Sequence, residues 1–300
     1  MGNRRTIRRI RKNTQRLVLI IFILSCVWGQ SEYQILMIPN NSFKLSVHNG
    51  LDALDLKKEF KDSTISNTSN NNYILSYLQY PSQINLVNFS YKRLTLKLLN
   101  YGLFEDKIDN YLINSFYSYE YLIQYNFHRE IFNMANMDIS LGCLYSNIAS
   151  YSSSAVISNI KFDTYVKQKK VDLAISIKNI GIILDSYTRY NQQLPLSLHF
   201  SIIKHIDQPR VYVGYDLIYN HNINDLEQII SIQADINQLI KLRCSTTNYK
   251  NDLMIVNSNK DLFYGLAFGI SIETEKISLI DIGISSLGAA GYIYGLTINF

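Results

Sequence analysis

The residues of this sequence that could do chemistry are charged side chains that alternate with apolar ones. Asp172 and Lys178 lie on the polar face of one such segment, and Arg210 and Asp216 lie on the polar face of another. A face that carries both signs can form ion pairs in an interior, or it can dock part of a partner. The full set comprises Lys97, Asp172, Lys178, Arg210, Asp216, Lys241 and Arg243, together with Glu120, Asp138, Asp235 and Asp281. We expect an internal ion-pair network, with the docking surface as the alternative.

The sequence gives little support for a catalytic site or a metal site. Nucleophilic catalysis needs a nucleophile, a histidine and a carboxylate within reach of one another. His199 alone among five histidines is expected to point inward, beside Ser197 and Ser201, but serine is common on such faces. No cluster of His, Cys, Asp or Glu has metal-ligand spacing, and Cys143 and Cys244 fall on apolar faces. We therefore predict a protein that is not an enzyme and has no cofactor or metal.

These charged residues must be positioned by strands, because apolar and polar residues alternate with a period of two from residue 73 onward. In 171–179, 194–202 and 210–219 the second face is mostly polar or small, so the inward faces are expected to be polar and small. Fourteen strands are predicted: Asn72–Tyr80, Ile84–Lys92, Arg93–Tyr101, Ser115–Phe127, Ile131–Tyr145, Ser154–Val166, Val171–Asn179, Pro195–Lys204, Pro209–Asn220, Leu226–Ile236, Gln238–Asn248, Leu262–Thr274, Lys276–Ser286 and Tyr292–Phe300.

The last strand favours a membrane barrel. Its apolar face consists of Tyr292, Tyr294, Leu296, Ile298 and Phe300, and outer-membrane barrels close on such a strand as an assembly signal. Faces with five or six apolar positions suit the ~9–11 tilted residues that cross a bilayer. Tyrosine is abundant, with 23 residues, and several lie near strand ends, where the ring suits the headgroup level. The prediction is an all-β, transmembrane antiparallel β-barrel of about 14 strands. A soluble sheet or sandwich is the alternative.

The N-terminus is typical of an exported protein. Seven Lys or Arg residues precede the apolar run Leu17–Leu24, and small residues up to Gly29 suit a signal peptidase, so 1–29 is predicted to be a signal peptide. A lipoprotein acceptor at Cys26 is the alternative. The net charge of +5 becomes −2 without these seven basic residues, which argues against a nucleic-acid partner.

Residues 30–72 differ from the strands and are expected to form an N-terminal hatch or plug ahead of the barrel at 73–300. Within them, 35–50 has weak strand character and Leu51–Phe60 fits a short helix. Residues 62–72 read as a polar loop.

Six segments in sequence resemble a known family. They are Leu36–Gly50, Lys97–Phe104, Ala174–Gly181, Leu194–Leu198, Ile240–Arg243 and Tyr264–Gly269. In order and spacing they resemble the PorV/PorQ family of outer-membrane barrels of the Bacteroidetes and their relatives, and its PorQ branch most closely, over about residues 35–300. Family members usually carry Asn-Pro-Ala before the first long strand, where this chain reads Asp62 to Asn72.

The resemblance implies a non-enzymatic scaffold of the type IX secretion system that helps to attach secreted cargo to the cell surface. It also implies a bacterial outer-membrane location, contact with outer-membrane lipid, and PorU-, PorV- and PorZ-like protein partners. The expected protein-contact surfaces are the N-terminal segment and the loops Glu105–Asn114, Ile182–Leu194 and Tyr249–Asp261.

The family is related in architecture to the long-chain fatty-acid transporter FadL, so a channel for hydrophobic small molecules is the alternative function. Such a channel needs an apolar pocket inside the barrel, which Leu51, Leu54, Leu56 and Phe60 could line. Polar and small inward faces argue against it.

Overall fold

The computed structural model describes most of the barrel and part of the segment before it. The described residues are 33–54, 73–108, 111–131, 135–187, 192–237, 239–248, 263–274 and 279–300. The predicted signal peptide 1–29, the polar loop 62–72 and the loop Tyr249–Asp261 lie outside them, as do Leu56 and Phe60.

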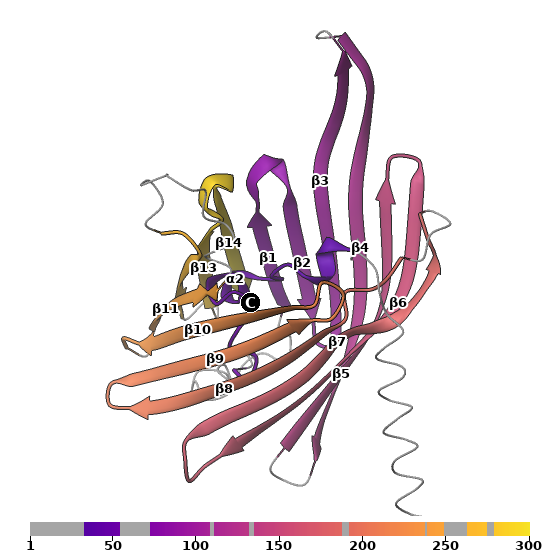
Figure 1. The fold of residues 1–300 in the computed structure, drawn as a ribbon. Coiled ribbons are helices and arrows are strands. Elements are labelled where there is room, and N and C mark those ends of the chain that lie inside the picture. Colours follow the sequence, from indigo (N-terminus) through magenta and orange to yellow (C-terminus); the bar gives the residue numbers. More distant parts are fainter. Residues whose placement is uncertain are drawn as a thin grey trace, which may run out of the picture.

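Fourteen antiparallel strands of the described chain form a closed barrel (Figure 1). The strands are β1 (Tyr73–Gln79), β2 (Asn85–Tyr91), β3 (Leu94–Ile108), β4 (Tyr111–Ile131), β5 (Ala135–Ile148), β6 (Tyr151–Val166), β7 (Val171–Asp185), β8 (Ser197–Asp207), β9 (Arg210–Asn220), β10 (Asp225–Asp235), β11 (Ile240–Thr247), β12 (Leu266–Ile272), β13 (Leu279–Ser286) and β14 (Tyr292–Asn299). The predicted barrel of fourteen strands is confirmed, and each predicted strand overlaps one observed strand.

Closure comes from the pairing of β1 with β14. Leu75 lies opposite Ile298 and Tyr77 opposite Leu296, and the Phe300 amide donates to the Tyr73 carbonyl over 2.9 Å. A closed ladder pairs the backbone groups of every strand on both sides, which a strand needs in order to lie in lipid. No helix in the described part of the chain is long and apolar enough to cross a membrane.

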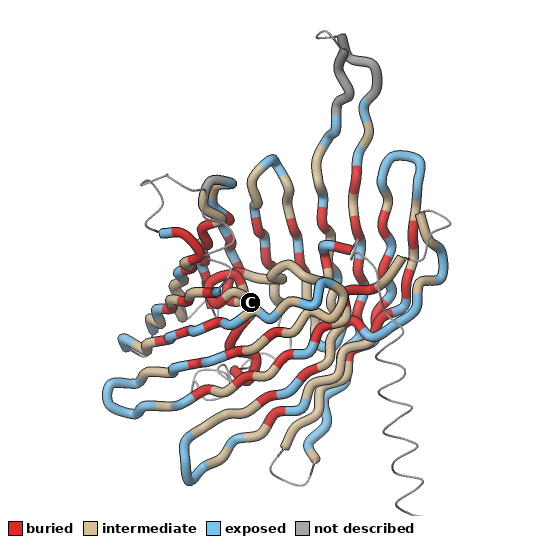
Figure 2. The backbone as a smooth tube through the Cα atoms, viewed as in Figure 1, coloured by how far each residue is buried: buried red, intermediate tan, exposed pale blue. Residues whose placement is uncertain are grey.

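The two faces of the barrel differ as the alternation predicts (Figure 2). On β4, Tyr121 and Ile123 are exposed, whereas Glu120 and Leu122, which alternate with them, are buried. On β14, Leu296 is exposed and Thr297 is buried. The exposed face is therefore apolar and the buried face points into the lumen, which is the arrangement of a barrel surrounded by lipid.

The inward faces are less uniformly polar than expected. Leu78, Leu86, Leu99, Leu122 and Leu144 point inward and are buried in one apolar cluster with residues of the segment before β1. The expectation of polar and small inward faces was wrong for these strands. The same cluster contains Tyr33, Ile35 and Leu45 of that segment, and burial of apolar surface is favourable wherever it occurs.

Two predicted loops are wholly or partly strand. The predicted loop Glu105–Asn114 lies mostly within the long hairpin of β3 and β4, and β7 continues to Asp185 into the predicted loop Ile182–Leu194. In the first case the rings of Phe104 and Phe116 stack across the hairpin with centroids 5.3 Å apart. Such cross-strand aromatic pairs stabilise a hairpin beyond the point at which the core-facing pattern ends.

Residues 33–54, which we call the inner segment, lie inside the barrel. They contain a 3-10 helix η1 (Gln34–Leu36) and a short α-helix α2 (Ser42–Ser46), so the expected strand character of 35–50 was wrong. The Asn41 side chain caps α2 by accepting from the Lys44 amide over 2.7 Å. The closed ladder leaves no edge with which an inner strand could pair, and helical turns satisfy their own backbone groups.

Candidate functional site

Helix α2 rests on three glycines of the barrel wall. A methyl group at Gly283 of β13 would lie 2.4 Å from the Ser42 carbonyl oxygen, and one at Gly269 of β12 would lie 2.5 Å from the Ser46 Cβ. On β14, a methyl group at Gly295 would lie 3.0 Å from a Leu45 methyl group. Each inward glycine thus makes room for the backbone of α2, and larger residues there would push the helix away from the wall. We call β11–β14 the docked wall.

Beside these glycines lies a buried ion pair that the helix completes. The Arg243 guanidinium pairs with the Asp281 carboxylate, and their side chains are 0% and 1% exposed. Arg243 Nε donates to Ser46 Oγ over 2.9 Å, and Ser42 Oγ donates to Asp281 Oδ1 over 2.5 Å. The guanidinium also lies over the Phe43 ring, 4.7 Å from its centroid. Both charges therefore have additional partners, as buried charges require.

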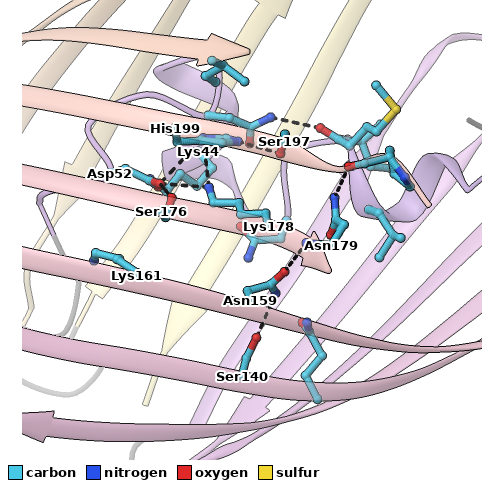
Figure 3. A pocket seen from close by; sticks show the side chains of 18 of the residues that line it. Lys44, Asp52, Ser140, Asn159, Lys161, Ser176, Lys178, Asn179, Ser197 and His199 are labelled. Atoms are coloured by element: carbon cyan, nitrogen blue, oxygen red, sulfur yellow. Dashed lines mark hydrogen bonds and ion pairs between the residues drawn. The ribbon is translucent and has the colours of Figure 1, made fainter. Parts of the chain in front are cut away.

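A second charged cluster joins the end of the inner segment to the opposite wall (Figure 3). The Asp52 carboxylate forms ion pairs with Lys178 Nζ at 2.9 Å and with Lys44 Nζ at 2.8 Å. Ser176 Oγ donates to the same carboxylate over 3.2 Å. Burial by itself would raise the pKa of Asp52, but Lys178 and Lys44 hold that pKa well below its usual range. Asp52 is therefore an anion that ties α2 to β7.

Two wall carboxylates bind the backbone of the inner segment directly. Asp216 Oδ2 accepts from the Leu51 amide over 2.8 Å, and Glu120 Oε2 accepts from the Ile35 amide over 2.9 Å. Tyr101 adds a hydrogen bond to the second oxygen of Glu120 over 2.9 Å. Carboxylates that accept backbone hydrogen bonds fix the position of a segment without a cation.

His48 is the titratable group of the inner segment that faces the docked wall. Its Nδ1 lies 2.8 Å from Ser245 Oγ, and Ser285 Oγ lies 3.4 Å from its Nε2. Burial lowers the pKa of His48 to about 4, so the ring is neutral at pH 7. The docking of this residue is therefore sensitive to acid.

Between the inner segment and strands β1–β10 remains a cavity of about 870 Å³. We call these strands, β1–β10, the cavity wall. The cavity is lined by four lysines, Lys44, Lys97, Lys161 and Lys178, and by carboxylates that include Asp52 and Asp138. Amides and hydroxyls fill much of the rest, among them Asn88, Gln124, Ser140 and Asn159. The cavity is large enough for a small organic molecule and is lined to bind a polar one.

The predicted charge set is divided by the structure. Arg243, Asp216 and Lys178 contact the inner segment or its charged residues, and Lys97 lines the same cavity as Lys178. Asp172 does not meet Lys178; its carboxylate lies 2.5 Å from His205 Nε2. The remaining members are placed as follows: Lys241 lies 3.3 Å from Glu273, Asp138 lies 2.6 Å from His128, Arg210 is exposed at the start of β9, and Asp235 lies at the end of β10.

Sequence reasoning missed Asp52 and Lys44, which complete the network from the inner segment. No signal in the sequence points to them, because neither residue belongs to an alternating strand and their partners lie up to 126 positions away. Buried Ser42 and Ser46 escaped notice for the same reason.

Ser197, His199 and Asp52 form a sequence of contacts that resembles a catalytic triad. Ser197 Oγ lies 3.1 Å from His199 Nε2, and His199 Nδ1 lies 3.7 Å from Asp52. However, Lys178 Nζ lies 3.2 Å from the same Nδ1, and an ammonium group can only donate. Nδ1 must then accept, so Nε2 carries the proton and cannot remove one from Ser197. Lys178 holds Asp52 in place, and the arrangement is not set up for nucleophilic catalysis.

Metal ligation is likewise unsupported within the described residues, where no group of three or more His, Cys, Asp and Glu side chains is arranged to hold an ion. Cys143 is exposed and Cys244 is partly exposed, and neither forms a disulfide. Both fall on the outward face, as the alternation predicts.

Comparisons with known proteins show the fold. No family model and no curated protein matches the chain. Among solved structures, the toluene transporter TodX of Pseudomonas putida is similar with a TM-score of 0.51 and 11% identity, over 91% of this chain and 97% of that one. The KdgM porin is similar with a TM-score of 0.39 and 7% identity, over 76% and 98%. A Rh. blastica porin mutant has a TM-score of 0.36 and 10% identity, over 77% and 99%.

Proposed function

We propose that this chain is an outer-membrane barrel of the PorV/PorQ type that acts as a non-enzymatic scaffold in type IX secretion and in the attachment of cargo to the cell surface. The closed barrel with an apolar outer face supports the membrane location. The observation that carries the scaffold is the inner segment, whose backbone and charges are bonded to walls on opposite sides of the lumen. A lumen that holds its own chain so firmly suits docking of a protein better than free passage of a solute.

The proposal is tested by fractionation and co-purification. We expect the chain in the outer-membrane fraction, and we expect PorU-, PorV- or PorZ-like proteins to be recovered with it after detergent extraction and chemical crosslinking. A variant with an added affinity tag but without the inner segment provides the control for non-specific capture. Recovery of the chain from the soluble periplasm contradicts the location, and recovery from the membrane without any such protein contradicts the scaffold.

A channel for hydrophobic small molecules is the second candidate. It is favoured by the likeness to TodX, which is described as a toluene transporter, and by the apolar cluster inside the barrel. Tyr33, Ile35 and Leu45 of the inner segment already pack in that cluster, so a hydrophobic ligand would have to displace them. Retention of labelled fatty acid or toluene by the purified barrel, lost when Ile35→Asp is introduced, would favour the channel over the scaffold.

A further inference from the structure

A row of inward polar residues runs across six neighbouring strands. Residues that face one another in register are Ser271 of β12, Asp281 of β13, Thr297 of β14, Ser76 of β1, Asn88 of β2 and Lys97 of β3. The first four form two hydrogen-bonded pairs. Ser271 Oγ donates to Asp281 over 2.5 Å and Thr297 Oγ1 donates to Ser76 Oγ over 3.0 Å. Ser42 of α2 bonds to the middle of this run, so the inner segment satisfies that part of the row.

The last two members of the row extend past the helix and face the cavity. Asn88 is 3% exposed, and its Oδ1 is buried without a hydrogen-bond partner among the described residues. Lys97 lies directly opposite Asn88 and also lines the cavity. Within the described chain, its ammonium group has no carboxylate within ion-pair distance, which is 4.0 Å. An enclosed ammonium and a buried amide oxygen without partners both destabilise a protein unless something binds them.

The other three lysines of the cavity do have such partners. Lys44 and Lys178 share Asp52, and Lys161 lies 3.8 Å from Asp138 and 3.7 Å from Asp163. The described part of the chain thus supplies carboxylates for three of the four lysines that line the cavity and leaves Lys97 available. Gln124 of β4, which is buried and lines the cavity near Thr95, adds an amide to the same side.

We infer that this cavity binds a small hydroxylated anion, whose carboxylate or phosphate group pairs with Lys97 and whose hydroxyl group donates to Asn88 Oδ1. The cavity volume of about 870 Å³ exceeds what a simple inorganic ion requires and lies in the range of small-molecule sites. The inference does not depend on the secretion partner, because it concerns the lumen alone.

The test uses the full-length protein in detergent at constant ionic strength. Gluconate represents the carboxylate source, glycerol 3-phosphate the phosphate source, and glycerol the neutral control. Binding is measured by calorimetry and by the temperature at which the barrel unfolds. We expect at least one of the two anions to bind and to raise the unfolding temperature, while glycerol has no effect. Which anion binds identifies the source of the charge.

Two variants each lower the net charge of the site by one, by different chemical changes. Lys97→Gln removes the unpaired charge, and Asn88→Asp supplies the missing carboxylate within the protein. Both are expected to weaken anion binding at least tenfold while leaving the ligand-free barrel as stable as, or more stable than, the wild type. A merely structural Lys97 would give the opposite result for the ligand-free barrel. Lys92→Gln, in the exposed turn that precedes β3, is the control and should bind the anion normally.

The inference is overturned if neither anion binds the wild type, or if Lys97→Gln binds as tightly as the wild type. It is also overturned if both variants fail to fold, because a site that serves a ligand must be dispensable for folding. Loss of anion binding leaves co-purification with secretion partners unchanged, so the two proposals fail independently.

Discussion

The docked wall and the cavity wall face the same inner segment and bind it by different means. On the docked wall, glycines let the backbone of α2 approach, and Arg243 and Asp281 are enclosed beneath it. On the cavity wall, inward leucines share an apolar cluster with side chains of the segment, and Lys178 reaches across to Asp52. The size of the inward side chains therefore decides how closely the inner segment approaches each wall. Where they are glycines the backbone of the segment touches the wall, and where they are larger a cavity remains.

Removal of one charge from the docked wall should cause the largest loss of stability. Asp281→Leu leaves the Arg243 guanidinium buried without a counterion, and we expect a loss of about 3–5 kcal/mol of stability. Unfolding of the purified barrel in detergent, followed by its shift in gel mobility on heating, measures the effect. The double variant Asp281→Leu with Arg243→Met should recover most of the loss. Equal stability of the single variant and the wild type would contradict the role of the pair.

Acid should weaken the docking of His48 against the docked wall. His48 has a pKa of about 4 in the folded protein against an ordinary value of 6.5, so the unfolded chain binds more protons between these pH values. Its contribution to stability is complete above pH 6.5 and is lost as the pH falls to about 4, with a total of at most about 3 kcal/mol. Asp52 has a depressed pKa, so the stability that it provides persists to lower pH than that of His48.

Unfolding measured from pH 7 to pH 4 tests this difference. His48→Gln should flatten the slope in that window, whereas Lys178→Leu should leave the slope in place. Equal slopes for the wild type and His48→Gln would show that His48 is not held in its neutral form.

A smaller change to the docked wall tests whether its glycines position α2. Gly283→Ala places a methyl group 2.4 Å from the Ser42 carbonyl, and overpacking of this kind costs about 1–3 kcal/mol. We expect faster hydrogen exchange at the amides of 42–46 in mass spectrometry. Ile282→Ala, on the exposed face of the same strand, is the matched control and should leave that exchange unchanged. Slow exchange in both variants would mean that α2 does not need the glycine.

The smallest effect is expected at Asp172, which lies on the same strand as Lys178 but contacts His205. Asp172→Leu removes the contact with His205 and should cost about 1 kcal/mol or less, as for partly exposed pairs. Lys178→Leu removes a partner of Asp52 and should increase hydrogen exchange near residue 52. Identical exchange profiles for the two variants would indicate that Asp172 and Lys178 belong to one network after all.

The barrel could be predicted because each strand carries its own signal. In β14 the alternation of Leu296 and Ile298 with Gly295 and Thr297 defines both faces without reference to any other strand. The length of the hairpin between β3 and β4 could not be predicted, because the pairing of Phe104 with Phe116 lies beyond the core-facing pattern.

The candidate site was predicted only on the side of the wall. Lys178, Asp216 and Arg243 are marked by their inward positions, but their partners Asp52, Leu51 and Ser46 lie in a segment without periodicity. The contact between Leu51 and Asp216 spans 165 residues, and no local rule selects it. That Lys97 has no carboxylate partner in the described part of the chain could not be foreseen either. It depends on which wall lysine Asp52 of the inner segment reaches, and that lysine is Lys178.

Helix α2 lies across the junction of the first and last strands, with contacts to β1 as well as to β13 and β14. Ser42 bonds to Thr297, which bonds in turn to Ser76 on the other side of that junction. The ring can form this junction only after the final strand has been synthesised, so a residue made early is positioned to guide the last step of assembly. Removal of the helix should therefore slow the maturation of the barrel even where the finished barrel tolerates its loss.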